Sequence, residues 1–287
     1  MKIVTLTTDL GLKDHYVASL KGQLLSKNSD IQLIDISHQV QTFNIGEASY
    51  YINNVINDFP DGTIHFLGVD SIPDISIDSH KTNSYPIVML LNEQYFVGSD
   101  NGIFSLLKNF HEAKTIVRLD FSSKNAFRHP FKNIYVPAIS AILNGGKIEN
   151  LGEKIEVKDL NRALTTQALI GENLIKGSVI HVDIYGNVIV NITEQLFQKI
   201  GKGNPFTIYF RHKNYFIDRI SENYNEVAIG EKLALFNENG WLEIALNKAT
   251  SSTGGGAASL LGLKTNEIVR VEFHPKGSKD RIDDLFG

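Results

Sequence analysis

The chain has 287 residues, and at roughly 150 residues per domain this length suggests one large domain or two smaller ones. It contains no cysteine, which excludes a disulfide scaffold, a thiolate zinc site and a cysteine nucleophile. The formal net charge of −4 argues against a nucleic-acid binder held by bulk positive charge. No apolar run reaches the roughly 18 residues that span a bilayer, and the first residues lack the pattern of a signal peptide. We therefore expect a soluble, cytoplasmic protein without membrane or nucleic-acid partners.

The first half of the chain alternates between strand and helix patterns. The expected elements are strands at 3–6, 31–36 and 64–69, helices at 16–25, 48–56 and 134–143, and a hairpin formed by 87–91 and 95–97. Asp14 is placed to favour the first turn of the first helix, and Asn44 with Glu47 resembles a capping box for the second. This alternation predicts an α/β domain with a mostly parallel sheet.

The second half changes character after about residue 165. Short strand-like runs are expected at 178–182, 188–191, 206–209, 232–236, 242–246 and 268–273, with glycine-containing turns between them and one short helix near 193–200. This pattern predicts a small all-β domain, an antiparallel barrel or sandwich. We expect an α/β domain at 1–165, a β-barrel at 172–275 and a frayed tail at 276–287, with the polar stretch 154–167 as the connection.

Two aspartates stand where an α/β sheet binds ligands. Asp9 follows the first strand and Asp70 follows the third, and ligands bind beyond the carboxyl ends of parallel strands. A carboxylate there can accept hydrogen bonds from both hydroxyls of a ribose, or it can orient a water molecule. The alternative is structural: Asp9 caps the following segment and Asp70 begins a turn.

A turn in the second half gathers three further candidates. Asp183, Tyr185 and Asn187 place a carboxylate, an aromatic ring and an amide within five residues between two strands. An amide offers a donor and an acceptor together, which suits the edge of a purine. The alternative is a tight turn whose side chains bond their own backbone. The glycine run 254–256 lacks the ending of a phosphate-binding loop and is expected to be a flexible turn, and the histidines show no metal-ligand spacing.

Several short motifs occur in a fixed order from Ile3 to about Phe273. They are Thr7-Thr8-Asp9-Leu10-Gly11 with Asp14, Tyr16 and Lys21-Gly22; Ile34-Asp35-Ile36-Ser37-His38; Phe59-Pro60-x-Gly62-Thr63; Asp100-Asn101-Gly102; Asp183-x-Tyr185-Gly186-Asn187 with Asn191; and Phe236-Asn237-x-x-Gly240-x-Leu242-Glu243-Ile244-Ala245. In their order and spacing these motifs resemble the S-adenosylmethionine hydroxide adenosyltransferase family, which is related to the fluorinase and chlorinase enzymes.

The resemblance implies an N-terminal α/β domain, a C-terminal β-barrel domain and a homotrimer whose ligand sites lie between subunits. It implies no cofactor, with S-adenosylmethionine as substrate or ligand. Five residues and one turn, carried over by motif, would bind the nucleoside and its methionine part. Asp9 would hold the ribose diol, Phe43 would line the nucleoside pocket, Asp183 would meet the methionine ammonium, Asn187 the adenine edge and Tyr224 the adenine face. The turn Asn237–Gly240, which includes Glu238, would approach the methionine carboxylate.

The reaction implied is displacement at the ribose C5′ by water, which releases adenosine and L-methionine. Family hydrolases prepare that water with an Asp, an Arg and a His. Here Asp70 stands at the Asp position, the usual Pro-Gly-Val-Gly and the following Arg are replaced by residues 71–78, and Arg128 and His129 are the candidates for the missing groups. A hydrolase with an altered catalytic set is therefore the first hypothesis. The alternatives are a binder or sensor of S-adenosylmethionine or adenosine without turnover, and a changed nucleophile such as a halide.

Overall fold

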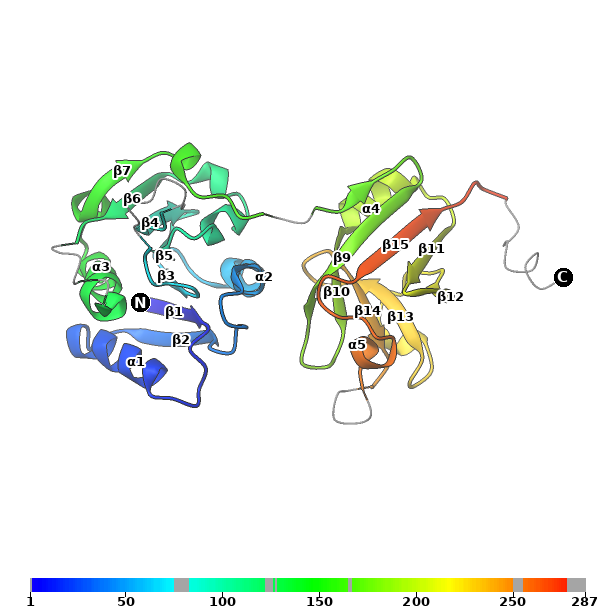
Figure 1. Ribbon diagram of the computed structural model, residues 1–287, viewed down its shortest axis with the longest axis horizontal. Helices are drawn as coiled ribbons and strands as arrows, with labels where there is room; N and C mark the ends of the chain where they lie inside the picture. The colour runs from blue at the N-terminus through cyan, green and yellow to red at the C-terminus, as the bar shows by residue number, and fades with distance from the viewer. Residues whose placement is uncertain are drawn as a thin grey trace. The chain divides into compact units, whose positions relative to one another are not determined.

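The computed structural model describes residues 2–74, 83–121, 126, 128–164, 167–249 and 255–277. The chain forms two compact units, Met1–Thr165 and Thr166–Gly287 (Figure 1). The second half of the 71–78 segment, Gly254 of the glycine run and the tail beyond Gly277 lie outside the described residues. Among the helices that are described, none has the length and apolar character needed to cross a membrane.

Seven strands form the sheet of the first unit, in the order β2-β1-β3-β5-β4-β6-β7. They are β1 (Ile3–Thr8), β2 (Gln32–Ser37), β3 (Ile64–Gly68), β4 (Pro86–Leu91), β5 (Gln94–Ser99), β6 (Thr115–Leu119) and β7 (Gly152–Ile155). The pairs β1–β2, β1–β3 and β3–β5 are parallel, whereas β4 pairs antiparallel with β5 and β6, and β6 pairs antiparallel with β7. The sheet is therefore mixed, and all of its strands except β4 and β7 run in one direction, as the prediction of a mostly parallel sheet requires.

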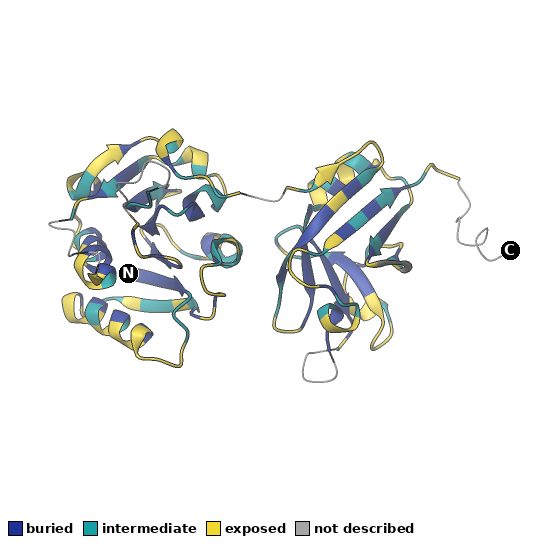
Figure 2. Cartoon of the chain, viewed as in Figure 1, coloured by how far each residue is buried: buried dark blue, intermediate teal, exposed yellow. Residues whose placement is uncertain are grey.

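Helices cover both faces of this sheet. They are α1 (Tyr16–Lys27), α2 (Ile45–Val55) and α3 (Val136–Leu143). Leu20 and Leu24 of α1 pack with α3 and with Val88 in one buried cluster, while Ile52 of α2 packs with Ile87 in another. Because adjacent residues of a strand face opposite sides, Val88 and Ile87 identify the two layers. The unit is thus a three-layer α/β/α arrangement, with β1 buried along its whole length (Figure 2).

The ends of the helices agree only in part with the sequence patterns. Asn44 is the N-cap of α2, and its side chain accepts a hydrogen bond from the Glu47 backbone as predicted. The box is not reciprocal, because the Glu47 carboxylate accepts from the backbone of Gln41 instead. Asp14 does not lie in the first turn of α1, which begins at Tyr16 after His15. The predicted connection also begins too early, since Lys154 lies in β7.

The second unit is an all-antiparallel, nearly closed barrel. Its strands are β8 (Leu169–Ile170), β9 (Leu174–Val182), β10 (Val188–Thr193), β11 (Phe206–Phe210), β12 (His212–Ile217), β13 (Lys232–Phe236), β14 (Trp241–Leu246) and β15 (Ile268–Phe273), with the helices α4 (Glu194–Gly201) and α5 (Ala257–Leu260). The order is β12-β11-β15-β9-β10-β14-β13, with β8 paired to β9, and the end strands β12 and β13 contact each other. The barrel is as predicted, and β12 is the strand of the closed path that the sequence patterns missed.

Candidate functional site

In the first unit, the loops after three neighbouring strands meet at one carboxylate. Asp9 follows β1, and its Oδ2 accepts hydrogen bonds from the backbone N–H of Phe43 at 2.9 Å and of Asp70 at 3.4 Å. Phe43 belongs to the loop after β2, and Asp70 follows β3. Because β2, β1 and β3 are adjacent and parallel, their carboxyl ends form the edge at which doubly wound sheets bind ligands.

Both residues bonded to Asp9 have left-handed backbones. Phe43 has φ 64° and Asp70 has φ 45°, a region that costs roughly 1 kcal/mol or more for residues other than glycine. The Asp9 carboxylate compensates by accepting the N–H of each. The Phe43 side chain stays 69% exposed, so it stands free on the surface of this unit rather than filling its core. The arrangement holds an aromatic ring and two carboxylates around one edge of the sheet.

The two aspartates influence each other electrostatically. Partial burial raises the pKa of Asp70, and the charge of Asp9 raises it further. Asn101 supports the same loop, because its side-chain amide donates to the carbonyl oxygens of Val69 at 3.0 Å and Asp70 at 2.9 Å. The backbone of Asp70 is thus held on both sides, and its carboxyl group has an increased proton affinity, which is a property of general bases.

Arg128 and His129 are exposed and precede a π-helical turn at Phe131–Tyr135 that runs into α3. Among the described residues, neither side chain forms an ion pair or hydrogen bond with Asp70. Their segment does pack near it: the Tyr135 hydroxyl donates to the carbonyl oxygen of Ser71 at 2.7 Å, and the Phe131 ring contacts Phe66 of β3. The structure therefore places this segment beside the loop of Asp70 without joining the three predicted catalytic side chains.

A chain of polar contacts supports the segment before Asp9, which sequence reasoning cited only as part of a motif. The His38 ring hydrogen-bonds Thr8 Oγ1 at 2.7 Å through Nδ1 and lies 3.1 Å from Asp35 through Nε2. Lys21 Nζ lies 2.6 Å from the other carboxylate oxygen of Asp35. Burial acts to raise the pKa of Asp35, but the hydrogen bonds and charges of Lys21 and His38 outweigh it, so the pKa lies below its usual value. These contacts position the end of β1.

A buried carboxylate beside the site gives a testable pH effect. Burial raises the pKa of Asp100 to about 6, although the Asn161 backbone and Arg118 act in the opposite direction. The folded state thus binds more protons than the unfolded state between pH 4 and 6, so this group's contribution to stability is complete below pH 4 and is lost as the pH rises through 6. Over that interval it amounts to about 3 kcal/mol of unfolding free energy.

We expect Asp100→Asn to remove most of that decline, because the amide resembles the protonated acid. Urea unfolding from pH 4 to 7, followed by circular dichroism, measures it. Trp241 is the single tryptophan and lies in the second unit, so its fluorescence provides an internal control that the substitution leaves unchanged. If the unfolding free energy of the first unit depended on pH equally in wild type and variant, Asp100 would not be the group responsible.

In the second unit, the turn between β9 and β10 is ordered by Asp183. Its Oδ1 accepts from the backbone of Tyr185 at 2.9 Å and of Asn187 at 2.8 Å, and its Oδ2 accepts from the Asn187 side-chain amide at 3.0 Å. The tight turn that the sequence offered as the alternative to ligand binding, in which side chains bond their own backbone, is therefore present. In this turn Tyr185 is 59% exposed and Asn187 is buried.

The glycine run packs closely against this turn. A Cβ on Gly256 would lie 2.3 Å from the carbonyl oxygen of Tyr185, and one on Gly186 would lie 2.8 Å from the Cα of Gly256. Both positions therefore need glycine. The Ala258 backbone also donates to Gly186 at 2.9 Å. Residues 255–258 thus pack against the Asp183 turn, so the prediction of a merely flexible turn is wrong for this part of the run.

Two further candidates of the second unit act on Glu243, a residue that the sequence patterns did not single out. The Tyr224 hydroxyl donates to Glu243 Oε1 at 2.5 Å, and the Asn237 side chain acts to lower the pKa of Glu243. The charge of Asp183 acts on both Glu243 and Tyr224, and that of the exposed Glu238 acts on Tyr224. Burial raises the pKa of Tyr224 above its usual value, and Glu243, Asp183 and Glu238 add to the increase. The charges that act on this pair are therefore negative.

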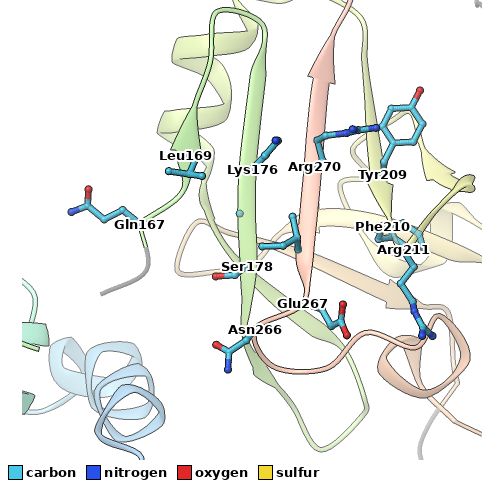
Figure 3. A pocket seen from close by; sticks show the side chains of 12 residues that line it. Gln167, Leu169, Lys176, Ser178, Tyr209, Phe210, Arg211, Asn266, Glu267 and Arg270 are labelled. Carbon is cyan, nitrogen blue, oxygen red and sulfur yellow. The ribbon is translucent and has the colours of Figure 1, made fainter. Parts of the chain in front are cut away.

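A surface groove of about 630 Å³ lies elsewhere on the barrel (Figure 3). Lys176 of β9 and Arg270 of β15 project from neighbouring strands into it, and the Arg270 guanidinium lies over the Tyr209 ring at 5.1 Å. None of the predicted site residues lines this groove. The predicted site residues thus lie outside this groove. Within the described ranges, no group of three or more His, Asp or Glu residues could hold a metal ion.

The fold and these residues define a two-unit protein with two aspartates and an exposed aromatic ring at the edge of an α/β sheet, and a carboxylate-rich cluster on a β-barrel. Residues 4–152 match the SAM hydroxide adenosyltransferase N-terminal domain, and residues 177–270 match the C-terminal domain of the same family. The chain belongs to the SAM hydroxide adenosyltransferase family.

Known relatives extend over nearly the whole chain. An (R)-S-adenosyl-L-methionine hydrolase of Methanocaldococcus jannaschii is 29% identical over 257 residues, which cover 85% of this chain and 88% of the relative. A fluorinase of Actinopolyspora mzabensis is 22% identical over 275 residues, 86% of this chain and 91% of the relative. The crystal structure of an uncharacterized conserved protein from Thermotoga maritima superimposes with a TM-score of 0.76 at 26% identity, covering 94% of this chain and 99% of that one.

Proposed function

We propose that this protein hydrolyses S-adenosylmethionine to adenosine and L-methionine by attack of water on the ribose C5′. The observation that supports this most strongly is the cluster of Asp183, Glu243 and Tyr224, in which the Tyr224 hydroxyl donates to the Glu243 carboxylate at 2.5 Å and the charge of Asp183 acts on both. Such a cluster suits a ligand with positive charges, and S-adenosylmethionine carries a sulfonium and an ammonium. Membership of the family and the relatives named as hydrolases support the same reaction.

In this proposal the second unit binds the base and the methionine part. Asp183 meets the ammonium, the buried Asn187 pairs with the adenine edge, and the half-exposed rings of Tyr185 and Tyr224 offer their faces to the base. The turn at Asn237 and Glu238 approaches the methionine carboxylate. Because Glu238 is exposed, its carboxylate can turn away from that of the ligand.

The first unit binds the ribose and prepares the water. Asp9 uses Oδ2 for two backbone N–H groups, and its Oδ1 accepts the ribose hydroxyls beside Phe43. Asp70 orients the water and accepts its proton, with Arg128 and His129 assisting. The water oxygen bonds to C5′ while the C5′–S bond breaks, and its electron pair goes to sulfur, which leaves as a neutral thioether. Placement and partial dehydration of the water are the main requirements, because the leaving group is already good.

The residues of the proposed site are divided between the two units, which supports a homotrimer with ligand sites between subunits. Light scattering should then give three times the 32.0 kDa of one chain. A particle of single-chain mass at micromolar concentration would contradict the trimer. We further propose that the protein acts in the cytoplasm.

The reaction is tested by incubating the pure protein with S-adenosylmethionine and separating the products by chromatography. The expected products are adenosine and L-methionine in equal amounts, formed faster than in a control without protein. Arg128→Ala and His129→Ala should each lower turnover by about tenfold or more, as expected for groups that assist proton transfer. Full turnover in both variants would remove them from the mechanism.

A binder without turnover is the second candidate, and a specific feature favours it: residues 71–78 contain no arginine where family hydrolases have one. In that case S-adenosylmethionine would raise the melting temperature, in proportion to the logarithm of its concentration above Kd, and no product would form. The same incubation separates the two candidates.

A further inference from the structure

Glu243 lies on the outer face of the barrel, yet it is buried. Along β14, Leu242, Ile244 and Leu246 point into the barrel core, so Glu243 and Ala245 face outward. Its exposed fraction is only 5%. A glutamate on the outer face of a strand is normally solvated, so this burial requires a specific cover.

The cover is the segment 219–231, which carries Tyr224. Val227 of this segment packs on Leu233, Leu235 and Ala245, and its carbonyl oxygen accepts from the Asn247 side chain at 2.7 Å. The Asn247 carbonyl oxygen in turn accepts from the Gly230 backbone at 2.8 Å. The segment is therefore fastened over β13 and β14, and Tyr224 reaches Glu243 from it.

Glu243 connects the residues that the proposed function uses. It accepts from the Tyr224 hydroxyl at 2.5 Å, and the Asn237 side chain, from a separate segment, acts to lower its pKa. The Tyr224 ring is 40% exposed, so its hydroxyl end is anchored while a face remains accessible. In the strand register Glu243 lies opposite Ile189 of β10, and Asn187, two residues earlier, shares that face of the sheet.

The charge of this carboxylate is not balanced by a cation. Among the described residues, no Lys, Arg or His side chain lies within 4.0 Å of Glu243, and its neighbouring charge is that of Asp183. A buried carboxylate is costly unless it is hydrogen-bonded and paired with positive charge. The hydrogen bond from Tyr224 is present, and a cationic ligand would supply the charge.

We propose that Glu243 is a specificity-determining residue of the ligand site: its carboxylate orients the Tyr224 ring and, together with Asp183, favours an adenosyl ligand with positive charge over a neutral one. This inference rests on the proposed function, because it takes S-adenosylmethionine and adenosine as the two ligands. Glu243 acts through Tyr224 and through its field, so it is a positioning residue rather than a catalytic one.

The test compares the KM for S-adenosylmethionine, which is cationic at sulfur, with the inhibition constant of adenosine, the neutral product. Glu243→Gln keeps an acceptor for Tyr224 but removes the charge. We expect it to raise KM about tenfold, with kcat and the adenosine constant changing by less than about twofold. Glu222→Gln removes the same charge from an exposed side chain near Tyr224 and should change neither constant.

Tyr224→Phe removes the anchoring hydrogen bond and retains the ring, so it should raise KM and the adenosine constant by similar factors. If Glu243→Gln does not fold, Tyr224→Phe still tests whether the bond to Glu243 positions the Tyr224 ring. An unchanged ratio of the two constants in Glu243→Gln, or unchanged constants in Tyr224→Phe, would overturn the inference. A wild-type protein that forms no product would instead refute the proposed function, so the two failures are distinguishable.

Discussion

Asp9→Ala is expected to lower kcat/KM for S-adenosylmethionine by at least about 100-fold, the largest binding effect that the structure predicts. The carboxylate accepts the backbone N–H groups of Phe43 and Asp70, and in the proposed function it also accepts the ribose hydroxyls. Its loss would remove the ribose contact and release two left-handed residues from their common acceptor. Steady-state kinetics measures the effect.

Two further variants serve as comparisons for Asp9→Ala. Asp9→Asn retains one acceptor oxygen for the backbone groups and should have a smaller effect, which separates loop order from charge. Asp30→Ala changes an exposed aspartate of the same unit and should leave kcat/KM unchanged. An Asp9→Ala protein with wild-type kcat/KM would show that the ribose binds elsewhere.

Asp70→Asn is expected to lower kcat by about 100-fold or more while the KM for S-adenosylmethionine stays close to that of the wild type. Asparagine tolerates the left-handed backbone that Asp70 adopts, so the loop should keep its shape. The amide cannot accept the proton of the attacking water. An unchanged kcat would exclude Asp70 as the base.

The same carboxyl group predicts the shape of the pH profile. Burial and the charge of Asp9 raise the pKa of Asp70, and a general base acts only when deprotonated. The kcat of the wild type should therefore rise with pH through a midpoint above the usual pKa of an aspartate. Asp70→Asn should lose this acidic limb while the adenosine inhibition constant is unaffected.

The sequence predicted the fold where elements are long and regularly patterned. The strand and helix alternation of the first half and the short strands of the second both appear in the structure, and β13 and β15 have the predicted bounds. The strands that it missed, β6, β7, β8 and β12, are short or polar, and each is held by hydrogen bonds to a neighbouring strand. Pairing, rather than local propensity, makes them strands.

Part of the site could be predicted from the order of the strands. Parallel strands end at one edge, so the proximity of Asp9 and Asp70 follows from their places after β1 and β3. Arg128 and His129 precede a helix instead, and no strand register fixes their distance from Asp70. Their roles remain predictions that the variants above test.

The burial of Glu243 could not be predicted from the residues around it in the sequence. In Trp241-Leu242-Glu243-Ile244 it occupies an outward strand position, for which solvation is the ordinary expectation. Its burial depends on a segment that precedes β13, from which Tyr224 bonds it and Val227 packs on the nearby Ala245. The only signal in the sequence was its place within a family motif.

The central claim, that water attacks the ribose C5′, is tested most directly by running the reaction in water enriched in oxygen-18. The account predicts adenosine carrying one oxygen-18 atom, in the 5′-hydroxyl, and unlabelled L-methionine. Because the C5′–S bond breaks, the new oxygen must appear on the nucleoside. Unlabelled adenosine, label in the methionine, or no adenosine at all would contradict it.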